Sequence, residues 1–328
     1  MERTTVTLIY GPNRKTLTFP KDFLAGEPIA PRVLAGGKPP AEAFAEALAN
    51  PDGTPTLREL AAGRRVAIVS ADEFRAGLQK EIIDALLGEV VAAKPESVSL
   101  LFATGSHNPA IYTRNLAPAA EELARRHGVN LRIHGHDCDK SPHREVGTSP
   151  MGSPVLIDEL LLAADVRVYG HESKHHYMCG YSNIDKLVLP GVAARRSIEA
   201  NHKRALDPDS RGGRACYHPD PKRRSKPFAE DAHDARLLSE RFRLEGDKLV
   251  ESPVATFGLD MISEGGKVQW CAAGKPENLQ RRMAVAVDEA GGFEVDRAKY
   301  VVLSPGGPPA SQTLYSVQNC FDMALLGA

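Results

Sequence analysis

The apolar and polar positions of the chain alternate between two patterns, one typical of buried strands and one typical of helices. Short apolar runs at Arg65–Ser70 and Val98–Ala103 lie on either side of Leu78–Val91, which has helical spacing. This order predicts a β-α-β unit. The same alternation predicts a helix over Pro118–His127, a strand over Asn130–Ile133, a helix over Pro154–Ala164 and a strand over Val166–Tyr169.

Strands that are apolar throughout and alternate with helices are typical of an α/β fold. We therefore predict a Rossmann-like parallel sheet with helices on both faces. Ahead of it, β-rich runs at Thr4–Tyr10 and Lys15–Phe19 surround Gly11-Pro12-Asn13 and predict an N-terminal β-hairpin.

Two further strands are expected late in the chain, at Val268–Cys271 and Tyr300–Leu303, with a helix over Leu279–Ala290 between them. Another helix is expected from about Gln312. We therefore expect residues 1–290 to form one domain. Residues 291–328 are expected to be the opening segment of a second α/β domain, short or truncated.

The charge balance excludes some classes of partner. Among 328 residues, 41 Lys and Arg stand against 42 Asp and Glu, so no overall field favours nucleic acid or an anionic membrane. No stretch approaches the ~20 apolar residues of a membrane span, and the N-terminus lacks the pattern of a secretory signal. The five cysteines are scattered without a CxxC pair, which favours a reducing compartment. We expect a cytoplasmic protein that acts on a small molecule.

Polar side chains follow three of the predicted strands, at Ser70–Arg75, Thr104–His107 and Gly170–Glu172. In open parallel sheets, ligands bind beyond the carboxyl ends of the strands. Asp72 and Arg75 are either a surface ion pair or a carboxylate and a fork-shaped donor that face a bound anion. Their place at a strand end favours the second interpretation. By contrast, the basic segment from about Asp207 to Pro227 is rich in proline and glycine and predicts a surface loop.

Four of the eleven histidines are candidates for chemistry: His107, His175, His176 and His202. An imidazole can accept a proton, donate one or bind a metal near neutral pH. A histidine in a loop is more often only solvated, but the Thr-Gly-x-His turn at a predicted strand end favours a functional His107. His175 and His176 are adjacent rather than four residues apart, so they do not form a zincin-like pair.

Lys186 follows a loop with glycine and serine, Gly180–Asp185, and precedes Leu187–Gly191. A lysine in such a place can be a phosphate contact, an amine nucleophile or simply a surface lysine. The loop is not a Walker motif, because the GxxxxGK[ST] pattern is absent. The residues alone leave these alternatives open.

Taken in order, these segments resemble the lactate racemase family. The most specific part is the spacing of His176, Lys186 and His202. The other matching segments are Asp72-x-x-Arg75, Ala103–His107, Gly147-Thr148, Gly152–Pro154, Gly180–Ser182, Leu189–Gly191, Asn201-His202, Ser304–Pro308 and Leu314-Tyr315. The resemblance covers nearly the whole chain.

The resemblance implies an isomerase, a racemase or epimerase of 2-hydroxy acids, with a nickel-pincer nucleotide as its cofactor. It implies that Lys186 holds this cofactor covalently through a thioamide and that His202 is the protein ligand to nickel. Asp72 and Ser182 would contact the cofactor, and Arg75 would bind the substrate carboxylate. The enzymes that make the cofactor would be partners.

The resemblance also implies that His107 and His176 are the catalytic acid/base pair. Inversion passes through a planar 2-keto acid that is handled from opposite faces, so each enantiomer needs its own base for the hydroxyl proton. In the implied mechanism, a histidine removes that proton while the α-hydride passes to the cofactor. Residues 1–290 would then be the catalytic and cofactor-anchoring domain.

The chain departs from the usual family pattern in two places that bear on function. The loop before Lys186 has side chains where the family usually has two glycines, and Asp185 adds a negative charge near the expected phosphate position. Ser316 and Asn319 stand where lactate racemases have a substrate-binding glutamine and lysine. These changes argue against lactate itself and for a different or larger 2-hydroxy acid.

Two alternative functions stay open at this point. Asp185, Ser316 and Asn319 favour a noncatalytic relative that binds a nucleotide or a hydroxy acid in the same cleft. The other alternative is a histidine-dependent metallohydrolase, and the missing ligand spacing is the main argument against it.

Overall fold

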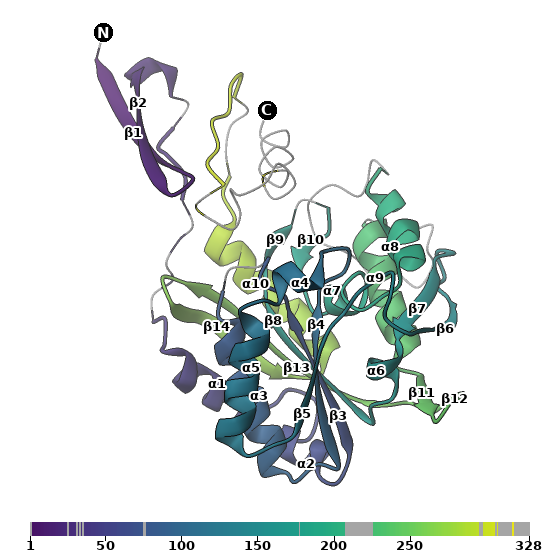
Figure 1. Cartoon of the computed structure of the whole chain (residues 1–328). Helices are drawn as coiled ribbons and strands as arrows, with labels where there is room; N and C mark the ends of the chain where they lie inside the picture. The colour runs from purple at the N-terminus through teal and green to yellow at the C-terminus, as the bar shows by residue number, and fades with distance from the viewer. Residues whose placement is uncertain are drawn as a thin grey trace.

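A six-stranded sheet forms the centre of the computed structural model (Figure 1). The described residues are 2–24, 26–30, 32, 34, 36–74, 77–176, 178–206, 226–294, 298–305, 307 and 317. The sheet has the strand order β14-β13-β8-β3-β4-β5. Its strands are β3 (Arg65–Ala71), β4 (Ser97–Ala103), β5 (Leu131–Gly135), β8 (Val166–Glu172), β13 (Ala255–Glu264) and β14 (Lys267–Gly274). All neighbours run parallel except β13 and β14.

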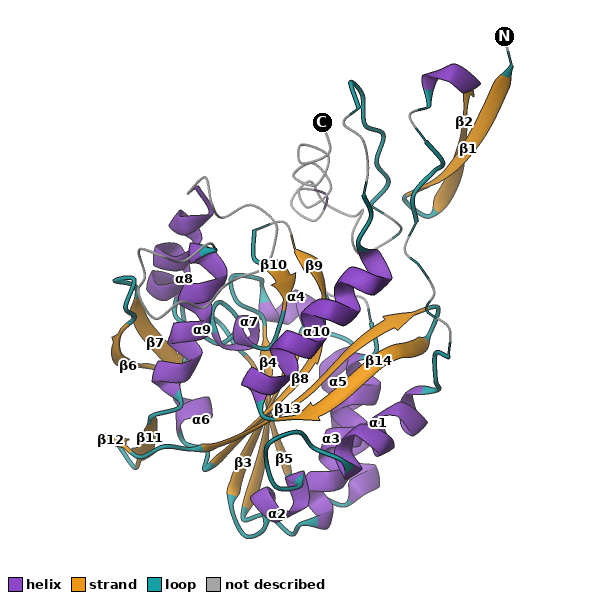
Figure 2. Ribbon diagram, turned by 180° about the vertical axis from the view of Figure 1, so that it is seen from behind, coloured by secondary structure: helices purple, strands orange, loops and turns teal. Residues whose placement is uncertain are grey.

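Helices cover both faces of this sheet, as Figure 2 shows from behind. One face carries α1 (Pro40–Ala49), α2 (Leu57–Ala61), α3 (Gln79–Ala92) and α5 (Leu116–His127). The other carries α6 (Glu159–Leu162), α7 (Asp185–Val188), α9 (Pro227–Ser239) and α10 (Pro276–Gly291). Phe44 and Ile82 belong to the core on the first face, and Leu161 and Leu187 to the core on the second. The predicted α/β fold is confirmed, and burial on both faces explains why the strands are apolar throughout.

Shorter elements surround this core. They are β1 (Arg3–Tyr10), β2 (Asn13–Pro20), η1 (Lys21–Phe23), α4 (Pro109–Tyr112), β6 (His143–Thr148), β7 (Pro154–Asp158), β9 (Lys174–His176), β10 (Gly180–Ser182), α8 (Arg195–His202), η2 (Lys203–Leu206), β11 (Phe242–Glu245) and β12 (Lys248–Glu251). The predicted N-terminal hairpin is confirmed as the antiparallel pair β1 and β2. Within the described part of the chain, every helix is too short or too polar to cross a bilayer.

The helix predicted over Pro154–Ala164 is wrong in its first half, where the chain forms strand β7. Val155 and Ile157 are buried and Leu156 between them is less so, which is the period of a strand rather than of a helix. Asp158 then caps α6, because its side chain accepts a hydrogen bond from the Leu160 amide.

Two further differences lie in the last third of the chain. The strand predicted at Tyr300–Leu303 is wrong, because these residues are exposed and irregular. Strand β13 was not predicted, because Gly258 and the buried Asp260 interrupt its apolar run.

The predicted domain boundary at residue 290 lies next to Gly291, where α10 ends. The helix expected from Gln312 lies outside the described residues, as do residues 207–225 of the predicted basic loop. Pro227, at the end of that loop, begins α9. The division into two domains therefore stays a prediction.

The topology of the sheet brings three strand ends together. From β3 the chain moves outwards through β4 to β5 and then returns to β8 on the other side of β3. The register pairs Ala71 with Ala103 and Ser70 with Gly170, so the segments after β3, β4 and β8 begin at one edge. Such a reversal of strand order opens a crevice in which α/β proteins bind ligands.

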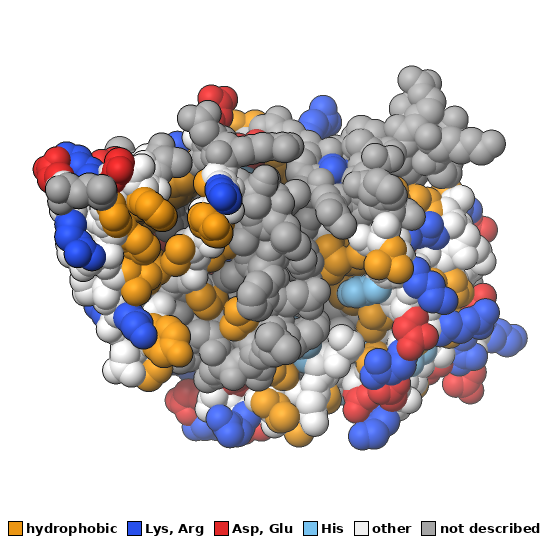
Figure 3. Space-filling view, turned by 90° about the horizontal axis from the view of Figure 1, so that it is seen from above, with side chains coloured by type: hydrophobic (Ala, Val, Ile, Leu, Met, Phe, Trp, Pro, Cys, Tyr) orange, Lys and Arg blue, Asp and Glu red, His pale blue; other side chains and the backbone are white. Residues whose placement is uncertain are grey.

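Figure 3 looks onto this end of the molecule. On the described part of that face, acidic and basic side chains lie together mainly towards the edges, and hydrophobic side chains gather on the left of the view. A single-sign patch suited to nucleic acid is not visible among the described residues on this face.

Candidate functional site

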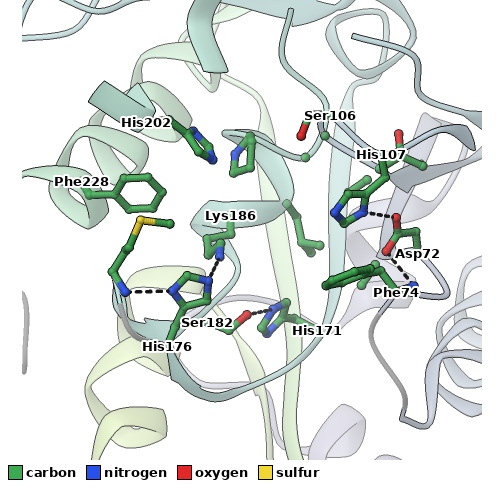
Figure 4. Close-up of a pocket in the computed structure, with 18 residues that line it drawn as sticks. Asp72, Phe74, Ser106, His107, His171, His176, Ser182, Lys186, His202 and Phe228 are labelled. Atoms are coloured by element: carbon green, nitrogen blue, oxygen red, sulfur yellow. Dashed lines mark hydrogen bonds and ion pairs between the residues drawn. The ribbon is translucent and has the colours of Figure 1, made fainter. Parts of the chain in front are cut away.

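One cavity at the carboxyl edge of the sheet is lined by most of the predicted site residues (Figure 4). They are Asp72, His107, His176, Ser182, Lys186 and His202. Arg75, the remaining one, lies outside the described residues. The cavity measures about 110 Å³, which is below the ~300 Å³ of a pocket that encloses a whole drug-sized ligand. It can therefore enclose the reactive end of a larger ligand.

His107 lies on the turn after β4 and is held by Asp72 from the end of β3. Gly105 in this turn has a φ of +56°, which glycine adopts without strain. The His107 Nδ1 lies 2.7 Å from the Asp72 Oδ2. Because carboxylate oxygens only accept, we assign the ring proton to Nδ1, which leaves a lone pair on Nε2.

The carboxylate of Asp72 is buried, and both of its oxygens have partners. Besides the contact to His107, its Oδ1 accepts from the Phe74 amide at 3.2 Å. The Phe74 ring packs on the imidazole of His107 with 4.5 Å between the centroids. Asp72, which was predicted to contact the cofactor, thus faces His107 in this structure.

His176 has the opposite arrangement of ring nitrogens. It lies in β9, paired with Gly180 of β10. Its Nδ1 accepts from the backbone amides of Met178 at 3.2 Å and Cys179 at 3.3 Å. Because these donors require a lone pair on Nδ1, the neutral ring carries its proton on Nε2.

The Lys186 Nζ lies 2.7 Å from the His176 Nε2. In the tautomer with its proton on Nε2, the histidine donates and the amine accepts, so this contact favours a neutral amine. A neutral amine is the nucleophilic form of lysine. The turn after Lys186 is tight: a Cβ on Gly191 would lie 2.3 Å from the Leu187 carbonyl oxygen, so a glycine is required there.

Asp185 points into the core rather than towards the cavity. The Arg236 Nε lies 2.6 Å from its Oδ1 and the His233 Nδ1 3.1 Å from its Oδ2. Burial disfavours the charged form, but Arg236 and His233 hold the pKa of this carboxyl well below its usual range. The expectation that Asp185 adds a negative charge at the ligand site is therefore wrong, because the charge is paired and buried.

His202 is the last residue of α8, and the backbone fixes one of its two ring nitrogens. Its Nδ1 donates to the Ile198 carbonyl oxygen at 2.9 Å, which leaves the lone pair on Nε2. Burial lowers the pKa of His202 to about 4. The ring is therefore neutral at pH 7, the form that binds metals.

Helix α8 is held in place by a buried carboxylate, Asp231 of α9. Its oxygens accept from Ser149 Oγ at 2.6 Å, from Ser153 Oγ at 2.8 Å and from Asn201 Nδ2 at 3.0 Å. Asn201 directly precedes His202. Ser153 belongs to Gly152–Pro154, one of the segments on which the resemblance rests. Through Asp231 it supports Asn201, the neighbour of His202.

His171 also lines the cavity and was not predicted as a site residue. Its Nε2 lies 3.2 Å from the Ser182 Oγ and its Nδ1 3.4 Å from Asp260 Oδ1. Its position near the carboxyl end of a core strand could have indicated that it faces the site. Phe74, Ser106, Met178 and Phe228 also line the cavity, and their residue types gave no signal.

The sequence and the structure were compared with known proteins. The family model of the lactate racemase N-terminal domain matches residues 10–213 of the chain. The chain belongs to the lactate racemase family.

Two curated members of the family named lactate racemase are similar to this chain. The protein from Thermoanaerobacterium thermosaccharolyticum is 27% identical over 275 residues, 82% of this chain and 58% of that protein. The one from Lactiplantibacillus plantarum is 28% identical over 163 residues, 49% of this chain and 38% of that protein. The chain thus matches about half of the length of these relatives or less.

The fold has a match among solved structures. The lactate racemase apoprotein from T. thermosaccharolyticum aligns with a TM-score of 0.74 and 24% identity, over 95% of this chain and 69% of that one. The likeness confirms the predicted fold of this member of the lactate racemase family.

Proposed function

We propose that the chain is the catalytic and cofactor-anchoring part of a racemase or epimerase of 2-hydroxy acids. In this proposal Lys186 carries a nickel-pincer nucleotide through a thioamide. The observation on which it rests is the 2.7 Å contact between the Lys186 Nζ and the His176 Nε2. This contact favours a neutral amine, and a covalent tether requires a nucleophilic nitrogen.

The residues of the cavity fit such a group. His202 offers a neutral imidazole with its lone pair on Nε2 and its other nitrogen fixed by Ile198, which suits a single protein ligand to nickel. Asp185 is paired within the core, so it does not repel a phosphate. Ser182 lines the cavity as a candidate hydroxyl contact for the nucleotide.

When bound, the cofactor supplies the site that accepts the α-hydrogen of the substrate as hydride and returns it. The proton chemistry falls to this chain. His107 takes the hydroxyl proton of one enantiomer at Nε2, and Asp72 stabilises the imidazolium that forms. His176 is proposed to take the hydroxyl proton of the other enantiomer, which requires the tautomer with its lone pair on Nε2. Figure 4 shows the two rings on opposite sides of the cavity, as inversion requires.

The proposed substrate is a 2-hydroxy acid other than lactate. Arg75 is proposed to bind its carboxylate, and Ser316 and Asn319 replace the family's glutamine and lysine. All three lie outside the described residues. The proposed partners are the enzymes that make the cofactor, and the proposed compartment is the cytoplasm.

The test is intact-mass analysis of the chain produced together with the cofactor-making enzymes. We expect a covalent adduct that is absent from Lys186→Ala and present in Lys174→Ala, a matched substitution of an exposed lysine on β9. Nickel should be present in the parent chain and lost in His202→Ala. An unmodified parent chain would overturn the proposal. An adduct-bearing chain that inverts no member of a panel of 2-hydroxy acids would favour the noncatalytic alternative.

A further inference from the structure

Three potential metal ligands converge outside the cavity described above. His134 and His136 lie two residues apart near the end of β5, so their side chains point to the same face of the sheet. Asp158, the cap of α6, lies beside them. One ligand atom from each of these residues lies within 4.8 Å of the others.

The distances are close to those of a coordination sphere. The Asp158 Oδ2 lies 2.8 Å from the His136 Nδ1 and 3.2 Å from the His134 Nε2. Ligand atoms at ~2.0 Å around a tetrahedral zinc ion are about 3.3 Å apart. A small outward movement of His136 would therefore admit an ion. The Ser141 Oγ, 3.0 Å from the His134 Nε2, completes the polar group.

The outer partners of these residues are those that orient metal ligands in proteins. The His136 Nε2 donates to the Ala193 carbonyl oxygen at 3.0 Å, which turns Nδ1 towards Asp158. The second oxygen of Asp158 accepts from the Leu160 amide at 2.9 Å. His136 is therefore fixed at Nε2 and Asp158 at Oδ1, while the His136 Nδ1 and the Asp158 Oδ2 face each other within the cluster.

The cluster is polar and enclosed. His136 is fully buried, and its two nitrogens face the Ala193 carbonyl oxygen and the Asp158 carboxylate. Next to it, the buried Nε2 of His143 has no hydrogen-bond partner among the described residues. The polar atoms of the cluster are thus already removed from water and oriented towards one another.

An ion can reach this cluster from solvent. The side chain of His134 is 30% exposed, in contrast to that of Asp158 at 2%. His134 and Asp158 both line a surface cavity together with Arg132 and Pro142. This cavity shares no lining residue with the one that contains Lys186.

We propose that His134, His136 and Asp158 bind a divalent transition metal, with zinc as the best match to two imidazoles and one carboxylate. The ion would have a structural task. It would tie β5 to the start of α6 and, through the Ala193 carbonyl oxygen, to the segment that leads into α8 and His202.

The test uses the full chain produced without the cofactor-making enzymes, in a His202→Ala background that removes the proposed nickel ligand. After incubation with Zn²⁺ and gel filtration, we expect about one zinc per chain by elemental analysis. The zinc should be lost in Asp158→Asn and in His134→Ala. It should be retained in His127→Ala, which removes another histidine paired with an aspartate, Asp84, at 2.7 Å. Zn²⁺ should also raise the melting temperature of the parent but not of the two variants.

Asp158→Asn keeps a side-chain oxygen that can cap α6, so loss of metal with an unchanged circular dichroism spectrum separates binding from folding. Bound Co²⁺ gives a second readout, a visible absorption that should vanish with the same substitutions. Zinc that persists in Asp158→Asn overturns the proposal, because the metal then lies elsewhere. A parent chain that retains no more zinc than the His134→Ala variant overturns it as well.

Discussion

At the scale of single residues, the two candidate histidines differ in the nitrogen that carries the proton, and the cause lies at Nδ1. His107 has a carboxylate there, whereas His176 has two backbone amides. The remaining Nε2 is therefore a lone pair on His107 and an N–H on His176. In the resting state one ring thus offers a lone pair and the other an N–H donor.

Asp72→Asn tests the first half of this arrangement. The amide can donate to the His107 Nδ1 and reverse the tautomer, and it cannot stabilise an imidazolium. We expect racemisation to fall by roughly 10²–10⁴-fold, measured as initial rates from both enantiomers by chiral chromatography. Intact-mass analysis should show that the variant forms the adduct as the parent does. Asp84→Asn, which alters the surface pair with His127, is the matched control and should keep full activity. Equal loss in both variants would contradict the assignment.

The second half concerns His176, which we infer acts on Lys186 before it acts on a substrate. His176→Phe removes the donor that favours a neutral amine, so the adduct should accumulate at least about tenfold more slowly. His107→Phe should form the adduct at the parent rate and fail only in racemisation. Timed intact-mass measurements distinguish the two. If His176→Phe formed the adduct at the parent rate, the inference that His176 activates Lys186 would be wrong.

At the scale of elements, one buried ion pair joins the helix that carries Lys186 to its neighbours. Arg236 of α9 contacts Asp185 of α7, Glu240, and Glu277 of α10. Arg236→Met would leave a buried carboxylate without its main partner, at a cost of about 3–5 kcal/mol in the free energy of unfolding. Arg195→Met, which breaks the exposed pair with Asp139, should cost less than about 1 kcal/mol. Urea unfolding of both variants measures the contrast.

The same pair predicts a pH dependence of stability. The folded-state pKa of Asp185 is lowered, so its contribution is complete above the unfolded value of about 3.9 and is lost as the pH falls towards the folded value. The stability difference between the parent and Asp185→Asn should therefore shrink below about pH 4. Urea unfolding at a series of pH values tests this. A difference that stays constant or grows on acidification would show that the carboxylate is not stabilised by folding.

The sequence predicted elements well where one periodicity dominates. The runs at β3, β4 and β8 are apolar because both faces are covered, and their spacing with α3 and α5 made the parallel sheet predictable. Strand β7 (Pro154–Asp158) was predicted as part of a helix, because proline is common both at helix starts and at strand ends. The role of Asp260 was not predictable, because a buried aspartate in a strand depends on a hydroxyl donor, Ser173, that is distant in sequence.

Within the candidate site, residue types with intrinsic chemistry were predictable, whereas their partners were not. Nothing local to Asp185 indicates that it pairs with Arg236, 51 positions away. Nothing local to Ser153 indicates that it supports Asn201 through Asp231. Such links depend on tertiary packing, which spacing along the chain does not encode.

At the scale of the whole molecule, the candidate site is assembled from two parts of one core. The strand ends supply Asp72 and His107, and the helical segments that follow supply Lys186 and His202. All four lie within residues 10–213, which the family model matches. The N-terminal hairpin takes no part in this arrangement, and Figures 1 and 2 both show it standing apart from the sheet.

Deletion of residues 2–20 tests whether the core is independent of the hairpin. Among the described residues, the hairpin is linked to the 302–305 segment, where Ser304 Oγ donates to the Ile9 carbonyl oxygen at 2.6 Å and a shared cavity adjoins it. Because this contact is small and exposed, the deletion should lower the melting temperature by less than about 4 °C. Adduct formation at Lys186 should persist.

A matched variant separates the contact from the strand pair itself. Ser304→Ala removes the hydrogen bond to Ile9 but keeps the hairpin, so it should have a smaller effect than the deletion on the melting temperature. A deletion variant that unfolds cooperatively at a much lower temperature, or that no longer forms the adduct, would mean that the hairpin stabilises the core. In that case the hairpin would have to contact the core in solution.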